Sequence, residues 1–263
     1  MARRTYLDGI LAVHRERAAA DTRDIDAMVG ACEALDPPRG FRARLASDSS
    51  SGLAVISEIK RRSPSKGDLN ASLDPSEMAR MYATGGASCL SVLTDVEHFG
   101  GSQEDLRRAR SAVDLPVLRK DFTVSVRDVL DTRLMGADCV LLIAAALAPG
   151  ELVEFHGVAE TIGLDVLVEI HDEEELSVAI EAGASLVGVN QRDLVTFEVD
   201  HERAVRMAGS IPRHMVSVAE SGVRGVEDAR ALREAGYDAV LVGESLVTAG
   251  DPSRAVEALR SVR

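Results

Sequence analysis

Short apolar runs and longer amphipathic stretches follow one another along most of the chain. Apolar runs of about five to eight residues bounded by turn residues are typical of buried strands, and apolar positions three and four residues apart are typical of helices. Four of the runs follow a turn of the form Gly-x-Ser or Gly-x-Asp, and four more fall between them. The eight predicted strands cover residues 53–60, 86–93, 115–120, 136–143, 164–169, 183–190, 214–220 and 236–243.

An amphipathic segment of helical length follows each predicted strand. These segments start near Pro75, Gln103, Val124, Pro149, Asp172, His201, Gly225 and Asp251. Helix C-caps are expected at Gly85 or Gly86 and at Gly136, Gly183 and Gly236. A repeat of about 50 residues that holds two strand–helix units and occurs four times predicts a (β/α)8 TIM barrel. An open doubly wound sheet normally has a Gly-rich dinucleotide loop after its first strand, whereas this chain has Ser63-Pro-Ser-Lys-Gly67 there.

Residues 1–50 differ from this repeat and predict an N-terminal helical extension packed on the barrel, within one domain of residues 1–263. The predicted helical faces are Leu7, Ile10, Leu11 and His14, and then Ile25, Met28, Val29 and Cys32. Pro37-Pro38 ends the second pattern.

Composition limits the classes of protein that the chain can belong to. It has 263 residues, 46% of them hydrophobic, and a net charge of −13. A large core is expected, and the acidic balance argues against a nucleic-acid-binding or membrane-surface protein. Cys32, Cys89 and Cys139 lack metal-ligand spacing, which favours a reducing cytoplasm. The N-terminus reaches charged residues too early for a signal peptide, and the longest uncharged run, residues 139–150, is too short to span a membrane.

Polar residues stand where the predicted strands end. In a barrel of this kind the C-terminal strand ends carry the chemistry, and alternate residues of each strand point inward. On the first strand the inward positions are Ala54, Ile56, Glu58 and Lys60; other strands end in Lys120, Glu169, Asn190 and Glu220. Charged residues could also stand there because strands simply run out into solvent. Their consistent clustering favours an active site.

The choice of basic residues supports this interpretation. Of the 30 basic residues only Lys60, Lys66 and Lys120 are lysines. Arg stays protonated in a protein, whereas the pKa of Lys can be tuned for proton transfer. We therefore predict chemical roles for Lys60 and Lys120. Lys66, in the loop after the first strand, is a weaker candidate because a loop lysine can simply be solvated.

Three further features allow more than one interpretation. The loops Glu220-Ser-Gly-Val-Arg224 and Val242-Gly-Glu-Ser-Leu246 follow the seventh and eighth strands, where barrels of this kind often bind phosphate through backbone N–H groups. Phe99 and Phe122 could form an apolar wall for a ring or fill the core. His171 with Asp172-Glu-Glu-Glu175 could suggest a metal cluster, but an acidic first turn of a helix explains the run better. We predict no metal site.

Six segments carry a resemblance to a known family. They are Glu58-Ile-Lys-Arg-Arg-Ser-Pro-Ser-Lys-Gly67, Ser91-Val-Leu-Thr94 with Phe99-Gly-Gly-Ser102, Leu118-Arg-Lys-Asp-Phe122, Gly188-Val-Asn-Gln-Arg-Asp-Leu194, Ala219-Glu-Ser-Gly222 and Val242-Gly-Glu-Ser-Leu246. Their order and content resemble indole-3-glycerol phosphate synthase of tryptophan biosynthesis, over nearly the whole chain. One departure is Gln191, where many relatives have Asn. Because its side chain should point away from that of Asn190, we expect little consequence.

The resemblance implies closure of 1-(2-carboxyphenylamino)-1-deoxyribulose 5-phosphate to indole-3-glycerol phosphate, with loss of carbon dioxide and water and without metal or organic cofactor. It implies Lys120 as the general acid, Lys60 as the partner of the substrate carboxylate, and Glu169 with Lys60 in the dehydration. Glu58, Asn190 and Glu220 would orient these groups. The remaining implied contacts to substrate are Ser63, Lys66, Phe99, Phe122, Arg192, Ser221, Gly222, Gly243, Glu244 and Ser245.

Other functions stay open at this point. Another phosphosugar barrel enzyme, either a ketose isomerase or a Schiff-base aldolase, is the first alternative, and an inactive barrel that serves as a binding module is the second. The isomerase is disfavoured by the full Glu-Ile-Lys and Ser-Pro-Ser motif, and the inactive barrel by the presence of all six strand-end residues. We expect a small phosphorylated substrate, neither a nucleic-acid nor a membrane partner, and a cytoplasmic monomer, with a weak dimer as the alternative.

Overall fold

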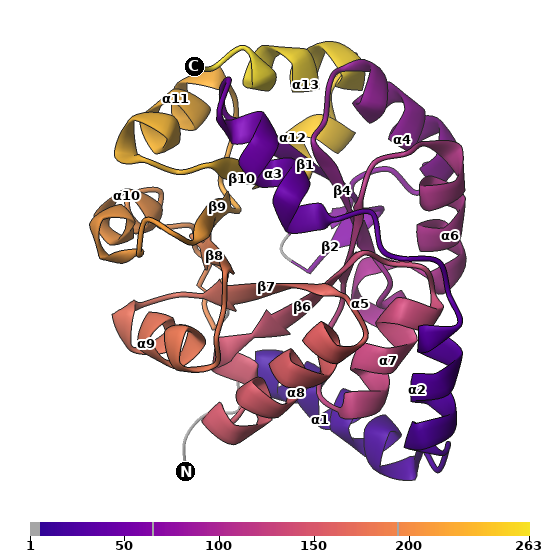
Figure 1. Cartoon of the computed structure of the whole chain (residues 1–263). Helices are drawn as coiled ribbons and strands as arrows, with labels where there is room; N and C mark the ends of the chain where they lie inside the picture. The colour runs from indigo at the N-terminus through magenta and orange to yellow at the C-terminus, as the bar shows by residue number, and fades with distance from the viewer. Residues whose placement is uncertain (1–5, 65, 194) are drawn as a thin grey trace.

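Eight parallel strands close into a barrel in the computed structural model, which describes residues 6–64, 66–193 and 195–263 (Figure 1). The predicted barrel is therefore confirmed. The strands are β1 (Ala54–Ile59), β4 (Cys89–Leu93), β5 (Val117–Lys120), β6 (Cys139–Ile143), β7 (Asp165–Ile170), β8 (Leu186–Asn190), β9 (Val216–Glu220) and β10 (Ala239–Val242). Each lies within or one residue beyond a predicted run. The first five residues, with Ser65 and Leu194 of the motifs, lie outside the described residues.

One helix follows each barrel strand and lies outside it. These helices are α4 (Pro75–Thr84), α6 (Gln103–Ala112), α7 (Val126–Leu134), α8 (Pro149–Thr161), α9 (Glu173–Glu181), α10 (Arg203–Met207), α11 (Val226–Ala235) and α13 (Pro252–Arg260). Six begin within one residue of the predicted position. The predictions at Val124 and His201 were two residues early, and at α7 the reason is the cap, because the Ser125 side chain accepts from the backbone of Asp128. No helix in the described part of the chain is long and apolar enough to cross a membrane.

Several short elements were not predicted, because they are too short to show a hydrophobic period. They are the hairpin β2 (Arg62–Ser63) and β3 (Gly67–Asp68), the helices α5 (Val96–Phe99) and α12 (Glu244–Val247), and the 3₁₀ turns η1 (Ala144–Ala146) and η2 (Ala208–Ser210). All of the predicted cap glycines except Gly85 adopt positive φ, among them Gly136 at 91°.

The core has two layers. Residues that point into the barrel form one apolar cluster, which includes Ala54 and Ile56, as predicted, and the buried free cysteines Cys89 and Cys139. The other strand positions pack against the surrounding helices in a second, larger cluster. This alternation fixes which strand residues can reach the inside of the barrel.

The N-terminal extension consists of α1 (Tyr6–Ala20), α2 (Ile25–Glu33) and α3 (Phe41–Ser49). Helix α3 lies across one end of the barrel (Figure 1) and buries Phe41 and Leu45 completely among the inward-pointing strand residues. This plug was not foreseen from the sequence. Of the predicted apolar faces, Ile10, Met28 and Cys32 are buried, whereas Ile25 is exposed.

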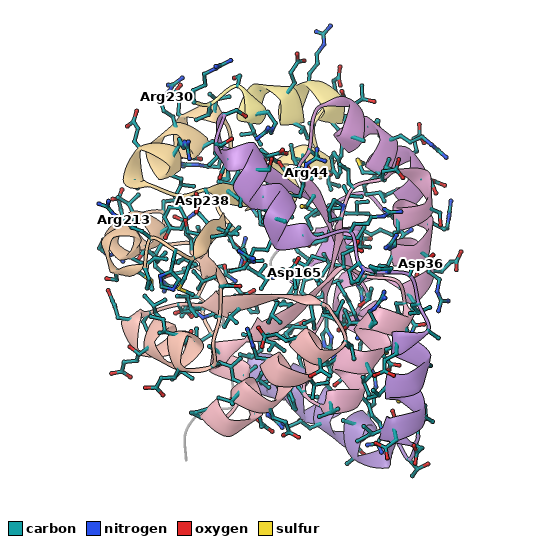
Figure 2. All side chains as sticks on the ribbon, in the orientation of Figure 1. Asp36, Arg44, Asp165, Arg213, Arg230 and Asp238 are labelled. Carbon is teal, nitrogen blue, oxygen red and sulfur yellow. The ribbon has the colours of Figure 1, made fainter. Side chains whose placement is uncertain are left out.

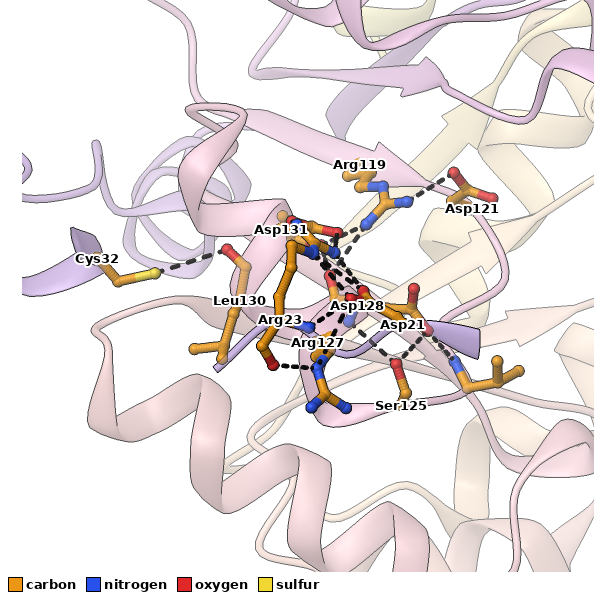
Figure 3. A network of polar contacts seen from close by, with 12 residues as sticks. Asp21, Arg23, Cys32, Arg119, Asp121, Ser125, Arg127, Asp128, Leu130 and Asp131 are labelled. Carbon is orange, nitrogen blue, oxygen red and sulfur yellow. Dashed lines mark hydrogen bonds and ion pairs between the residues drawn. The ribbon is translucent and has the colours of Figure 1, made fainter. Parts of the chain in front are cut away.

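A polar network joins the extension to α7 (Figure 3). The guanidinium of Arg23 donates to both carboxylate oxygens of Asp131 at 2.7 Å and also to Asp21. Arg127 of α7 donates to the backbone carbonyl of Arg23 at 2.7 Å. The extension therefore attaches to the barrel through charged contacts as well as through buried Cys32.

Aspartates mark the strand starts at the end closed by α3, and Asp138 among them is fully buried. Asp165 accepts from the backbone N–H of Arg42, and Asp238 accepts from that of Ser217, both at 2.9 Å (Figure 2). Asp138 accepts from the backbone N–H groups of Arg39 and Val117, both at 2.8 Å. These contacts tie the plug and the strands together at the end away from the predicted chemistry.

Candidate active site

A cavity of about 900 Å³ opens at the C-terminal ends of the strands. Every residue predicted for the site lines it. These residues are Glu58, Lys60, Ser63, Lys66, Phe99, Lys120, Phe122, Glu169, Asn190, Arg192, Glu220, Ser221, Gly222, Gly243, Glu244 and Ser245. The structure thus brings together positions that are up to 187 residues apart in the chain, from Glu58 to Ser245. Their individual roles remain predictions.

Lys120 stands at the end of β5 between two buried carboxyl groups. Its Nζ lies 2.7 Å from Glu169 Oε2 and 3.2 Å from Glu220 Oε2. The neighbouring Arg119 points the other way, and its guanidinium donates to the backbone of Asp128 on α7 and to Asp121 (Figure 3). The alternation of the strand therefore turns Lys120 into the cavity.

The pKa values of Lys120, Glu169 and Glu220 are shifted from their usual ranges in different directions. Burial alone would lower the pKa of Lys120, but the nearby carboxylates, first of all Glu169, outweigh it and hold the pKa above its usual range. Burial would raise the pKa of Glu169, but the cationic neighbours, led by Lys120, bring it below its usual value. Burial raises the pKa of Glu220 to about 7. Its buried Oε1 has no hydrogen-bond partner in the described part of the chain, which suits a carboxyl group that holds a proton near neutral pH.

A second pair stands at the end of β1. Lys60 Nζ donates to Glu58 Oε1 at 2.5 Å, and the hydroxyl of Ser91 donates to Glu58 Oε2 at 3.4 Å. A side chain at Gly243 would collide with this carboxylate, because its Cβ would lie 2.4 Å from Glu58 Oε1. Glycine at this position therefore leaves room for the Glu58–Lys60 pair.

Asn190 links the strand ends on the other side of the cavity. Its Nδ2 donates to Glu169 Oε1 at 2.8 Å, and its Oδ1 accepts from the backbone N–H of Arg192 at 3.0 Å. Gln191 points away from the cavity, as expected, and donates to the carbonyl of Ser221 at 2.8 Å. Ser221 has φ of 63°, so this contact holds a strained turn in place.

The predicted phosphate loops face each other beside β1. Ser63 Oγ is buried at the cavity wall without a hydrogen-bond partner among the described residues. The hydroxyl of Ser245 donates to the carbonyl of Val223 at 2.9 Å, which joins the two loops. The exposed Lys66 lies 3.8 Å from Glu244.

An apolar wall lines the rest of the cavity. The rings of Phe99 and Phe122 lie 6.3 Å apart and both line the cavity, and Phe122 also packs against the apolar cluster inside the barrel. The structure adds residues that the sequence did not single out for the site. Tyr6, Leu7 and Ile10 reach it from α1, Leu141 and Ile143 from β6, and Phe197 from the loop after β8. The period of α1 predicted its apolar face but not the surface that this face covers.

Other acidic side chains near the cavity accept hydrogen bonds from residues of the protein or belong to a helix start. Asp95 accepts from His14 and His98, and Asp121 accepts from Arg119 and Thr94. His14, Asp95 and Asp121 come close enough together to hold a cation, but these contacts already occupy them. Asp172 caps α9, and Glu173, Glu174 and Glu175 form its acidic first turn, which supports the helix interpretation of that run.

Comparison with known proteins identifies the family. The model of the indole-3-glycerol phosphate synthase family matches residues 6–259. This chain belongs to that family. Indole-3-glycerol phosphate synthase 2 of Streptomyces coelicolor is 51% identical over 226 residues, which is 86% of each chain. The indole-3-glycerol phosphate synthase of Mycolicibacterium vanbaalenii is 47% identical and covers 97% of this chain and 94% of its own.

A solved structure of another protein also supports the barrel fold. The thiamine phosphate pyrophosphorylase of Pyrococcus furiosus superposes with a TM-score of 0.58 over 81% of this chain and 96% of its own, at 20% identity. At that identity the likeness concerns the fold alone. Membership of the indole-3-glycerol phosphate synthase family rests on the sequence comparisons.

Proposed function

We propose that this protein is a carbon–carbon lyase of tryptophan biosynthesis. It converts 1-(2-carboxyphenylamino)-1-deoxyribulose 5-phosphate to indole-3-glycerol phosphate, carbon dioxide and water. The observation that carries this function is the placement of Lys120 between Glu169 and Glu220, across one cavity from the Glu58–Lys60 pair. The reaction needs an acid, a cation for a carboxylate and a base, and this arrangement supplies all three.

Lys120 protonates the substrate carbonyl as the aromatic carbon attacks it. The two carboxyl groups beside it hold its proton tightly in the ligand-free site. As the new bond forms, the carbonyl oxygen gains negative charge and becomes a better proton acceptor than the carbonyl was. Lys120 therefore gives up its proton in the transition state rather than earlier.

Lys60 holds the substrate carboxylate until carbon dioxide leaves. Its side chain is 16% exposed, and the rings of Phe99 and Phe122 line the same cavity. An apolar wall packs against the aromatic ring and keeps water from the charged pair, which strengthens their attraction. Glu58 orients Lys60 through the 2.5 Å contact.

Glu169 and Lys60 share the dehydration. Glu169 is held ionised by Lys120 and by the amide of Asn190, so that it accepts the proton lost from the substrate. Lys60 donates to the leaving hydroxyl. Glu220 orients Lys120 through their 3.2 Å contact.

The phosphate end of the substrate fits the loops after β9 and β10. Among the described residues the buried hydroxyl of Ser63 has no hydrogen-bond partner. The N–H groups of Glu244 and Ser245 stand at the start of α12, where a helix leaves its first donors free for a ligand, whereas those of Leu246 and Val247 already donate to the carbonyl of Gly243. Gly222 and Gly243 allow close approach, the backbone of Glu244 and Ser245 contributes N–H groups, and Lys66 adds charge at the rim. Arg192 and Ser221 support the sugar hydroxyls. We expect a cytoplasmic monomer that uses only these side chains and no cofactor.

The experiment is an assay of the purified protein with the carboxyphenylamino-deoxyribulose phosphate, followed by indole fluorescence. The chain contains no Trp, so the product signal rises from a low background. We expect turnover without added metal or cofactor. Absence of product, together with a substrate adduct trapped by borohydride on Lys60 or Lys120, would show a Schiff-base enzyme instead.

A further inference from the structure

His171 is a buried titratable side chain next to the site that the proposed reaction does not use. It follows the last residue of β7, and its side chain is only 12% exposed. Its Nδ1 lies 3.1 Å from Glu175 Oε2, and the same oxygen accepts from the backbone N–H of His171 at 2.7 Å. Its Nε2 is buried, has no hydrogen-bond partner among the described residues, and lies 3.9 Å from Glu169 Oε1.

The Glu169 carboxylate therefore has a possible cation on each side. Lys120 contacts Oε2, whereas His171 and the amide of Asn190 approach Oε1. A neutral imidazole that donates from Nδ1 to Glu175 would present a lone pair to Glu169, which is unfavourable. A protonated imidazole presents an N–H there and is flanked by two carboxylates.

We propose that His171 is a positioning residue that holds Glu169 ionised from the side opposite Lys120, with Glu175 fixing the imidazole ring. Glu175 is 21% exposed, so that the pair reaches from the buried base toward the surface at the start of α9. The role of His171 depends on the proposed role of Glu169 as the base.

The charges around His171 support this role. Glu169 faces it from its own strand, Glu175 from α9, and Arg203 of α10 lies nearby with its guanidinium bound to the carbonyl of Asn190 at 3.0 Å. Burial and Arg203 lower the pKa of His171, but Glu175 and Glu169 outweigh them and raise it above the usual value. The positive charge of His171 in turn helps to lower the pKa of Glu169.

The proposed role of His171 predicts how kcat depends on pH. Below the pKa of His171 its positive charge keeps Glu169 ionised to lower pH than Lys120 alone would. Removal of that charge raises the pKa of Glu169, so that the acidic limb of the kcat profile moves to higher pH. Above the pKa of His171 the ring is neutral in the wild type too, and the profiles of wild type and variant converge.

The variants that test this are His171→Asn and Glu175→Gln. For His171→Asn we expect the acidic limb to move up by about one pH unit, which lowers kcat about tenfold on that limb and leaves KM unchanged. Glu175→Gln keeps an acceptor for the ring, and His171 stays charged at the pH of the acidic limb, so this variant should leave the limb close to that of the wild type. For His171→Asn, a loss of kcat that is uniform over pH, or an unchanged profile, overturns the proposal.

His156→Asn is the matched control. His156 is also buried, and its Nδ1 lies 3.6 Å from Glu160, four residues on, in the same spacing as His171 and Glu175. Because His156 lies on α8 and does not line the cavity, its loss leaves the shape of the kcat profile unchanged. A shifted limb in this variant as well would assign the effect to loss of any buried histidine.

A titration without substrate tests the interaction between His171 and Glu169 independently of catalytic activity. The imidazole signal of His171 is followed by NMR in the wild type and in Glu169→Gln. We expect its pKa to fall by about one unit in the variant, because the adjacent negative charge is gone. Identical titrations overturn the proposal whether or not the protein turns over substrate. Coupled titrations in a protein that forms no indole-3-glycerol phosphate would refute the proposed function and leave the pairing intact.

Discussion

The two ends of the barrel use charged residues in different ways. At the end closed by α3 the carboxylates are aspartates, such as the fully buried Asp138 and the partly buried Asp165, and they accept from backbone N–H groups and from arginine. At the open end the buried Glu169 and Glu220 have Lys120 as their cationic partner. The buried Asp121 beside the same cavity pairs with Arg119, so the contrast concerns this lysine–glutamate group. The closed end joins segments of backbone, whereas the open end brings side chains together around a cavity.

The difference follows from what each cation can do. Arginine keeps its proton in a protein and offers several fixed N–H donors, so it suits permanent contacts such as Arg110 with Asp138. Lysine is a compact donor whose pKa responds to burial and to neighbours. A chain with 30 basic residues that places all three of its lysines around one cavity separates these tasks by residue type.

The largest expected effect is that of Lys120→Arg at the open end. The guanidinium keeps the positive charge between the carboxyl groups but does not release a proton, so kcat should fall about a thousandfold or more. Steady-state kinetics measure the loss, and equilibrium binding of the substrate should persist because the phosphate end is untouched. Turnover near that of the wild type would remove Lys120 as the acid and with it the distinction between the two ends.

The next effect is that of Asp138→Ala at the closed end. The side chain is fully buried and accepts from Arg39, Val117 and Arg110. Its removal leaves buried donors without a partner, which should cost about 3 kcal/mol of folding free energy. Denaturant unfolding measures this loss, while kcat per folded molecule should stay within about twofold because the cavity lies at the other end. A large fall in kcat with normal stability would contradict the separation.

The two ends also differed in how far the sequence could predict them. At the open end the strand ends could be recognised in the sequence, because charged residues follow the apolar runs there. Alternation along the first strand assigned Glu58 and Lys60 to the inside of the barrel. The closed end gave no such signal. Phe41 and Leu45 are two apolar residues in a short polar stretch, and only the closed barrel gives them a shared surface. Local pattern carries no information on which surface a short helix covers.

The same limit applies within the site. Tyr6 and Phe197 contact each other with ring centroids 5.1 Å apart, although nearly two hundred residues separate them. Phe197 has φ of 62°, a conformation that sequence does not predict for an aromatic residue. The run from His171 to Glu175 was correctly assigned to a helix start, but the approach of His171 to Glu169 depends on how β7 ends and α9 begins.

The smallest expected effect is that of Arg44→Lys on α3, the reciprocal of the first substitution. Arg44 donates to Asp48 one turn along the helix at 3.1 Å, and its side chain is 45% exposed at the closed end (Figure 2). Exposed pairs of this spacing contribute about 0.3–0.5 kcal/mol, and lysine can form the same pair. We expect a change of less than about 0.5 kcal/mol in the free energy of unfolding and no change in kcat. Exchange of the two cations would then be harmless at the closed end and severe at the open end. A loss of activity in Arg44→Lys would instead mean that the packing of α3 at the closed end affects the cavity at the other end.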